Sequence, residues 1–326
     1  MQAHRKQATT GSIVYVGSIT NEHAGGYRFR VRRRGVVVDE YFSAADHGSS
    51  EAALFAAMEL QKKISREFGM VQCKPIITDT EKQYIAGFFD GDGKIWLADR
   101  STEQKGKIRL AFNQSQDKGL PAVLVWISNI LGIRVRTTRR KLRENWRTYH
   151  DITVNGAVAI WLLQDLIPHA ILKTSAMERG LAILSCGDPD EKRLLVRSWR
   201  QTPFSQEYYR DINVEKFADR VTPAYLAGLF DADGTVGSSI RLKVGISQPS
   251  SPGLLAIIAS RFCPDSKQSM DKELQLCGPN AADLLMYIEG FVVAKKTQIA
   301  IALDMYRDPQ QRTEANVRLL RELKKL

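Results

Sequence analysis

The stretch Tyr84-Ile-Ala-Gly-Phe-Phe-Asp-Gly-Asp-Gly93 occurs twice in this chain, the second time as Tyr225-Leu-Ala-Gly-Leu-Phe-Asp-Ala-Asp-Gly234. Both copies begin with apolar residues, place two aspartates at positions i and i+2, and end at glycine. This pattern predicts a short helix whose C-terminal end carries two carboxylates.

The residues that flank each copy indicate where the two helices begin and end. Thr80 and Gln83 match a capping box ahead of the first copy, and Thr222-Pro223 supplies a cap and a first-turn proline ahead of the second. Gly93 and Gly234 match the left-handed position that follows a helix C-terminus.

Two features of these predicted helices need a structural cause. A glycine inside a helix costs about 1 kcal/mol relative to alanine, so Gly87 and Gly228 indicate close approach of two backbones. Carboxylates at a helix C-terminus face the negative end of the helix dipole. If the two helices pack in parallel through their Ala-Gly faces, both acidic ends arrive at one place and form a cluster suited to a divalent cation.

Both copies resemble the signature of LAGLIDADG homing endonucleases, in the single-chain form with two copies per polypeptide. The resemblance implies an α+β fold of two pseudo-symmetric αββαββα repeats, whose antiparallel sheets form a saddle over DNA. It also implies a metal-dependent double-strand break at a long non-palindromic site, with Mg²⁺ or Mn²⁺ as the cofactor. The alternative is a pair of core helices, each followed by an acidic turn.

The family's metal-binding acid is the last aspartate of the signature, which corresponds here to Asp92 and Asp233. The resemblance allows the backbone of Gly91 and Ala232 as further oxygen ligands. Two remaining acids are expected to cap or orient the helix ends: Asp90 and Asp231.

Four further catalytic residues follow from the same resemblance. Gln116 and Gln248 match the polar residue that ends the second strand near the cleft. Lys173 and Lys295 match the active-site lysine, which can hold the attacking water or stabilise phosphate charge. The alternative for each is a strand-end glutamine or a surface lysine without a catalytic role, and the nearest competitors are Gln114 and Lys296.

The composition favours a nucleic-acid partner. The 326 residues carry a formal net charge of +11, which on a chain that is 44% hydrophobic suggests a polyanionic partner, with a well-solvated basic surface as the alternative. No apolar run approaches the roughly 20 residues of a membrane span. The cysteines show no C-x-x-C pairing, so we expect reduced thiols in an intracellular protein, whether in an organelle, a nucleus or a bacterial cytoplasm.

Residues 1–72 are expected to form a separate module of three short strands and a helix. The predicted strands are 13–16, 27–32 and 36–42, and Ser49 or Ser50 is expected to cap the helix. Strand alternation places Arg28, Arg30 and Arg32 on one face, which can contact DNA. This stretch resembles, more weakly, an AP2-type or integrase-arm DNA-binding domain, and the alternative is an ordinary module with solvated arginines.

The rest of the chain is predicted as a first repeat at 76–186, a connector at 187–220, and a second repeat with a C-terminal helix at 221–326. In each repeat the order is helix, two strands, helix, two strands and helices. Basic residues on outward strand positions are the expected DNA contacts, together with the three arginines of the amino-terminal module: Arg109, Arg134, Arg136, Arg139, Arg241 and Lys243.

These observations favour a monomeric endonuclease that acts on double-stranded DNA. An RNA-splicing maturase on the same scaffold, with intron RNA as its partner, is the second hypothesis. The third is a DNA-binding regulator that does not cleave. Intact acids in both copies favour the nuclease, because a protein that only binds DNA does not need two carboxylates facing phosphate.

Overall fold

A computed structural model describes residues 18–22, 26–33, 36–49, 52–53, 55–57, 59–60, 77–97, 108–116, 119–138, 148–201, 213, 215–238, 241–264 and 272–323; at 18–39, 138 and 238 only the backbone is described. The chain divides into two compact units, Met1–Ile76 and Ile77–Leu326.

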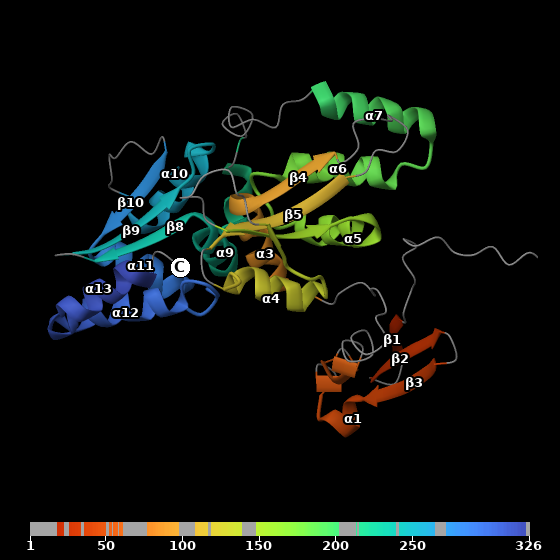
Figure 1. Ribbon diagram of the computed structural model, residues 1–326, viewed down its shortest axis with the longest axis horizontal. Helices are drawn as coiled ribbons and strands as arrows, with labels where there is room; N and C mark the ends of the chain where they lie inside the picture. The colour runs from red at the N-terminus through yellow and green to blue at the C-terminus, as the bar shows by residue number, and fades with distance from the viewer. Residues whose placement is uncertain are drawn as a thin grey trace, which may run out of the picture. The chain divides into compact units, whose positions relative to one another are not determined.

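The first unit contains a three-stranded antiparallel sheet in the order β1-β2-β3 (Figure 1). Its elements are β1 Ser18–Glu22, β2 Gly26–Arg33, β3 Val36–Ser43 and the short helix α1 Ala44–His47. Strands β2 and β3 lie where the sequence predicts them, whereas the strand predicted at 13–16 falls outside the described residues and β1 begins at Ser18. Ser49 accepts a hydrogen bond from the backbone N–H of Ala52, as expected of a helix cap.

The first repeat of the second unit follows the predicted order of elements, including the helices at its end. Its elements are α3 Asp79–Asp92, β4 Gly93–Leu97, β5 Ile108–Ser115, α4 Ala122–Leu131, β6 Arg136–Thr138, β7 Tyr149–Val154, α5 Gly156–Leu166 and α6 Thr174–Ser185. The strands form an antiparallel sheet in the order β4-β5-β7-β6.

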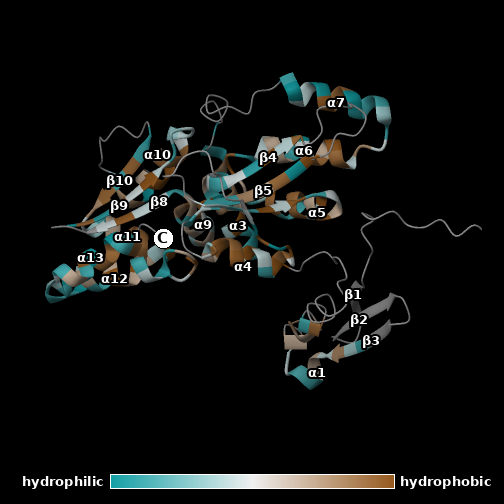
Figure 2. Cartoon of the chain, viewed as in Figure 1, coloured by the Kyte–Doolittle hydropathy of each residue, from teal (hydrophilic) through white to brown (hydrophobic). Residues whose placement is uncertain are grey.

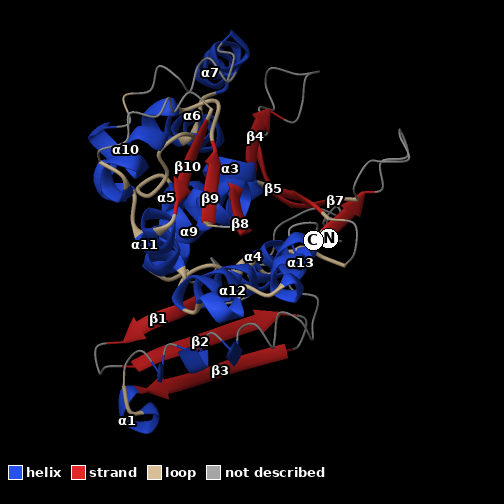
Figure 3. Cartoon of the chain, turned by 90° about the vertical axis from the view of Figure 1, so that its left-hand side faces the viewer, coloured by secondary structure: helices blue, strands red, loops and turns tan. Residues whose placement is uncertain are grey.

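The second repeat gives a shorter version of the same order. Its elements are α9 Pro223–Asp233, β8 Gly234–Ser238, β9 Leu242–Ser247, α10 Pro252–Phe262, β10 Glu273–Cys277, α11 Pro279–Ile288 and α12 Lys296–Arg307. Figure 3 shows its three described strands side by side, in the order β10-β9-β8. The order predicted for each repeat has a fourth strand, and residues 265–271, which precede β10, fall outside the described residues. The α+β class with antiparallel sheets in both repeats is confirmed.

Helices α3 and α9 pack directly on each other and join the two repeats (Figure 1). A Cβ added at Gly87 would overlap the carbonyl oxygen of Tyr225, and one added at Gly228 would overlap that of Tyr84. The two glycines therefore allow the close backbone approach that the sequence predicts.

The start of α3 differs from the prediction. The capping box is formed by Thr78 and Glu81, not by Thr80 and Gln83: Thr78 N–H donates to Glu81 Oε2 at 2.8 Å, and Glu81 N–H donates to Thr78 Oγ1 at 3.3 Å. For α9 the prediction is confirmed, because Thr222 is the N-cap and Pro223 occupies the first turn.

The ends of the two helices also differ from the prediction. Gly93 and Gly234 have φ of −73° and −82°, which is not left-handed, because each begins the strand that follows directly. Glycine is needed there for space, since an added Cβ would overlap the ring and carbonyl of Phe89 or Phe230, four residues earlier.

One hydrophobic core cluster runs through both repeats, and its described members extend from Ile77 to Leu320. Figure 2 shows hydrophobic residues interspersed with hydrophilic ones along the helices and strands of the second unit. Because α3 and α9 are buried at almost every apolar position, they are held from all sides and their C-terminal ends are fixed in position.

The connector and the C-terminal segment are partly helical. They contribute α7 Pro189–Gln201, η2 Glu215–Arg220, η3 Pro309–Gln311 and the predicted amphipathic helix, α13 Glu314–Leu323. Among the described residues, no helix is both long enough and apolar enough to span a membrane.

Candidate active site

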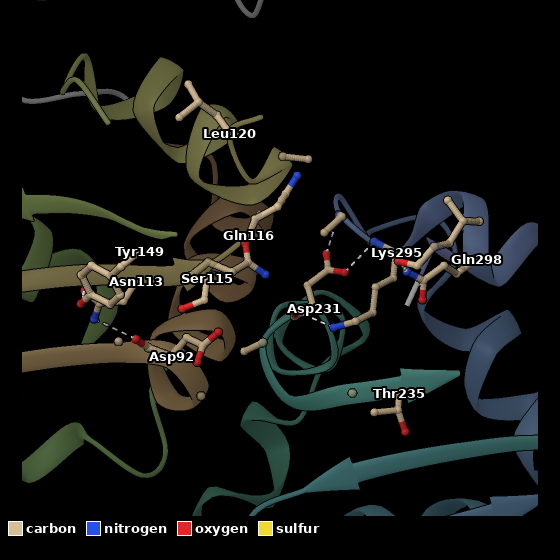
Figure 4. A pocket seen from close by; sticks show the side chains of 18 of the residues that line it. Asp92, Asn113, Ser115, Gln116, Leu120, Tyr149, Asp231, Thr235, Lys295 and Gln298 are labelled. Carbon is tan, nitrogen blue, oxygen red and sulfur yellow. Dashed lines mark hydrogen bonds between the residues drawn. The ribbon is translucent and has the colours of Figure 1, made fainter. Parts of the chain in front are cut away.

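A cavity of about 750 Å³ lies where the C-terminal ends of α3 and α9 meet. Residues from both repeats line it, among them Asp92 and Gln116 from the first and Ala232 and Lys295 from the second (Figure 4). In Figure 4 the carboxylate of Asp92 and the amide of Gln116 point into the space between the repeats. The site is therefore built from both halves of the pseudo-symmetric unit.

Asp92 lines this cavity, and Asp233 lies beside Gly91 at the same pair of helix ends, although it is not one of the residues that line the cavity. A Cβ added at Gly91 would overlap Asp233 Oδ2 and the side chain of Ala232, so the second helix end lies against the first. Burial raises the pKa of Asp92 to about 7, with the charge of Asp233 as the next cause, and burial also raises the pKa of Asp233. Two carboxylates that resist ionisation side by side form a site that a cation would stabilise.

Lys173 and Lys295 lie at the same helix ends, but their ammonium groups are directed at backbone carbonyls. Lys173 Nζ donates to the carbonyl oxygens of residues 89, 90 and 91 at 2.6, 2.6 and 3.1 Å. Lys295 Nζ donates to those of Phe230 and Asp231 at 2.7 and 2.6 Å. Each lysine thus caps the helix that carries the acid and places a positive charge beside it.

The charges of the lysines and the acids are coupled. Burial lowers the pKa of Lys173 to about 8, against the opposing effect of Asp90, Asp233 and Asp92. Burial likewise lowers the pKa of Lys295, whereas both lysines lower the pKa of Asp92. The lysines therefore favour the ionised form of the carboxylates that a metal requires.

Of the two roles that the sequence suggests for Asp90 and Asp231, capping or orienting the helix ends, the contacts match the second. Both acids bind the backbone of the segment ahead of a later helix. Asp90 accepts hydrogen bonds from the backbone N–H groups of residues 171, 172 and 173 at 2.7, 3.0 and 2.9 Å. Asp231 does the same for residues 293–295 at 2.7, 3.1 and 2.9 Å. These acids hold the beginnings of α6 and α12, a carboxylate at a helix N-terminus being favourable.

The two predicted glutamines do not occupy equivalent positions. Gln248 is buried and its Nε2 donates to Asp233 Oδ2. In the sheet register Gly93 pairs with Phe112 and Gly234 pairs with Ile246, so the residue two positions further is Gln114 in one repeat and Gln248 in the other. The counterpart of Gln248 is therefore Gln114, whose buried Oε1 has no hydrogen-bond partner among the described residues. Both Gln114 and Gln116 line the cavity.

Asn113 and Tyr149 are site residues that the sequence analysis missed. Asn113 Nδ2 donates to the backbone oxygen of Asp92 at 3.2 Å, and Tyr149 Oη donates to Asn113 Oδ1 (Figure 4). This chain of contacts connects strand β7 with the end of α3. No local motif marks either residue. The contact follows from the strand register, in which Asn113 pairs with Asp151 and Tyr149 lies two residues before Asp151.

The predicted DNA contacts lie mostly on exposed strand positions. Arg109 and Lys243 are exposed between buried neighbours on β5 and β9, and Arg134 and Arg241 are also exposed. Arg136 is 62% exposed and pairs with Asp151 at 2.5 Å. Arg139, together with the side chains of Arg28, Arg30 and Arg32, falls outside what the structure describes; these three arginines occupy alternate positions of β2.

The oxygen ligands at the helix ends fit a magnesium-type ion. Among the described residues no group of three or more His, Cys, Asp or Glu side chains could hold a metal ion. Mg²⁺ binds through one or two carboxylates and completes its coordination with water and substrate phosphate. The carbonyl of Gly91 already accepts from Lys173, so the carboxylates are the stronger candidates for ligands.

No protein-family model matches the sequence, and no curated protein matches it. Among solved structures, the chain is similar to the LAGLIDADG homing endonuclease I-GzeII in complex with its DNA target, with 12% identity over 75% of this chain and 97% of that chain and a TM-score of 0.49. It is also similar to the homing endonuclease I-WcaI bound to its DNA recognition sequence, with 12% identity over 74% and 90% of the two chains and a TM-score of 0.39. It is also similar to the homing endonuclease I-CvuI in complex with its target, with 24% identity over 44% of this chain and 94% of that chain and a TM-score of 0.29. Each of these solved structures is that of a homing endonuclease.

Proposed function

We propose that this protein is a LAGLIDADG-type endonuclease that cleaves both strands of double-stranded DNA at a long non-palindromic site. The observation that carries the proposal is the meeting of Asp92 and Asp233 at two helix ends that are themselves packed through Gly87 and Gly228. A core pair of helices does not need two buried carboxylates with raised pKa, because burying carboxyl groups that must ionise destabilises the fold.

The site residues divide the work of phosphodiester hydrolysis. Asp92 and Asp233 would hold Mg²⁺ or Mn²⁺, which supplies an activated water and stabilises the leaving oxygen. Lys173 and Lys295 keep positive charge beside the carboxylates, and Gln248 orients Asp233 through its hydrogen bond. Asn113 fixes the backbone of Asp92.

The exposed strand positions would provide the DNA-binding surface. Arg109 and Lys243 lie on strands of different repeats, with their neighbours along the strand buried in the core. Basic residues in such positions bind phosphates and base edges in the major groove. Since one chain carries both halves of the site, a monomer is sufficient for double-strand cleavage.

The test is a cleavage assay on a randomised double-stranded library, in the presence of Mg²⁺ and, separately, of Ca²⁺. Asp92→Asn and Asp233→Asn should abolish double-strand cleavage and leave DNA binding intact or tighter, because less negative charge then faces phosphate. Asp283→Asn, an exposed acid on α11, is the matched control and should cut at the wild-type rate.

If the Asp92→Asn and Asp233→Asn variants still cut both strands, the assignment of these two acids to catalysis is wrong. A wild-type protein that binds duplex DNA but cuts no member of the library would favour the regulator. Preferential binding of structured RNA over duplex DNA would favour the maturase.

A further inference from the structure

Two buried carboxylates next to the metal-binding acids are each bound by four hydrogen bonds. Asp90 and Asp231 are 3% and 0% exposed. Each accepts three backbone N–H donors from its own repeat, at residues 171–173 or 293–295. Each such segment ends in the lysine whose side chain returns to the carbonyls of the same helix end. The carboxylate and the lysine thus tie each helix end to the segment that follows within one repeat.

The fourth donor comes from the other repeat. Tyr225 Oη on α9 donates to Asp90 Oδ2 at 2.8 Å, and Tyr84 Oη on α3 donates to Asp231 Oδ2 at 2.6 Å. Both tyrosines are buried, and burial raises their pKa well above the ordinary value, so the hydroxyls remain protonated donors. Across the helix pair, the backbone carbonyl of Tyr84 faces Gly228 and that of Tyr225 faces Gly87.

We propose that Tyr84 and Tyr225 are positioning residues that act crosswise, Tyr84 on the lysine segment of Lys295 and Tyr225 on that of Lys173. Through these contacts each repeat fixes part of the catalytic centre of the other. The inference rests on the proposed endonuclease function and assigns to this site two residues that touch neither DNA nor metal.

The crosswise arrangement follows from how the contacts are connected. Tyr84 belongs to the first repeat, but the carboxylate that it binds holds the backbone of residues 293–295 in the second. Asp231 lies two residues before Asp233, so a shift of its carboxylate moves both the lysine segment and the metal-binding acid. Catalytic groups displaced by less than about 1 Å lose much of their effect, because the reacting atoms must be held in alignment.

The experiment uses Tyr84→Phe and Tyr225→Phe in the full chain, on the cleaved duplex with each strand labelled separately. Tyr84→Phe should slow mainly the strand that Lys295→Met slows, and Tyr225→Phe the strand that Lys173→Met slows. The expected loss is about tenfold to one-hundredfold, the range for a hydrogen bond to a charged group. Rates are measured at a temperature at which the melting curve shows each variant to be folded.

Double-mutant cycles identify which residues act together. Tyr84→Phe should be non-additive with Lys295→Met and additive with Lys173→Met, and the reverse should hold for Tyr225→Phe. Tyr287→Phe is the control, because it also removes a hydrogen-bonded hydroxyl, at 2.7 Å from Arg261, and should cut both strands at the wild-type rate.

Equal slowing of both strands by each tyrosine variant, coupling to the lysine of the same repeat, or wild-type rates would each overturn the inference while the nuclease assignment stands. If the wild-type protein cuts no duplex, the proposed function itself fails. A cycle of Tyr84→Phe with Asp231→Asn on the melting temperature reports the crossed contact without cleavage, and additivity there would also overturn the inference.

Discussion

Ionisation of the buried Asp92 carboxyl group lowers the stability of the folded protein. Its pKa of about 7 is above the ordinary 3.8 because it is buried and faces Asp233. A carboxyl group with a raised pKa stabilises the fold at low pH, and this contribution is lost as the pH rises through the folded-state pKa. The metal-free protein should therefore lose stability between about pH 4 and pH 7 as Asp92 ionises.

Asp92→Asn should remove that loss. Relative to wild type, the melting temperature of the metal-free variant should rise more at pH 7.5 than at pH 5.5, by about 2–4 °C for each kcal/mol of stability gained in a unit of this size. Both values lie below the pKa of about 8 at Lys173, so the lysine stays largely protonated throughout. Asp283→Asn should show no such difference. The same gain at both pH values would contradict the raised pKa.

At the scale of elements, the contact between α3 and α9 depends on two glycines. Gly87→Val and Gly228→Val should each force the helices apart, because any Cβ there overlaps a backbone carbonyl that cannot move alone. We expect a loss of about 1–3 kcal/mol or more for each, with reduced cleavage. Gly187→Val is the matched control, since an added Cβ meets nothing within 4 Å there. Melting curves and cleavage rates that match wild type in the first two variants would show that the helices do not meet through this face.

Local patterns predicted these two helices well and their ends poorly. Thr222 was identified correctly, because Thr-Pro before an apolar run has one reading. The first helix has two overlapping Thr-x-x-Glu/Gln patterns, at Thr78 and at Thr80. The structure forms the capping box at Thr78, which directly follows Ile77, a residue buried in the core. For Gly93, the left-handed rule failed because the chain continues straight into β4 and the ring of Phe89 occupies the Cβ position.

The acidic cluster at the two helix ends could be predicted from the repeated motif, and the choice of Asp92 and Asp233 as metal ligands follows from the family resemblance, whereas the contacts that support these acids could not be predicted. Tyr84 and Asp231 are 147 positions apart in the sequence, and no periodicity relates them. The equivalence of Gln114 and Gln248 likewise depends on the sheet register, that is, on which residues of neighbouring strands pair. The sequence of a single strand does not determine this pairing.

At the scale of the whole molecule, the amino-terminal unit is expected to add DNA contacts to those proposed for the second unit. The described core of the second unit contains no residue of the first, so changes in the sheet of the first leave that core intact. Strand β2 carries three arginines at alternate positions, opposite Tyr41, Asp39 and Val37 in the register. Such a row is typical of a strand that contacts phosphates.

Replacement of Arg28, Arg30 and Arg32 by alanine should weaken DNA binding and reduce its salt dependence by about one unit of log-log slope for each lost phosphate contact. Cleavage at high enzyme concentration should persist. The measurement is a salt titration of affinity on one long duplex. Lys192, Arg193 and Arg197 on α7 provide a control triple replacement with the same loss of charge. Identical slopes for the two triple variants would mean that the three arginines are only solvated charge.

The crossed tyrosine contacts also bear on the symmetry of the chain. Each repeat carries one tyrosine donor, one aspartate acceptor and one glycine. Across the helix pair, each tyrosine hydroxyl binds the aspartate of the other repeat, and each tyrosine carbonyl faces the glycine of the other repeat. A surface of this kind is complementary to a copy of itself, as in a two-fold symmetric dimer. Two copies of a half-length chain with these three residues could therefore pair through this surface without any new contact. Positions outside the surface need not be symmetric, as the different surroundings of Gln114 and Gln248 illustrate.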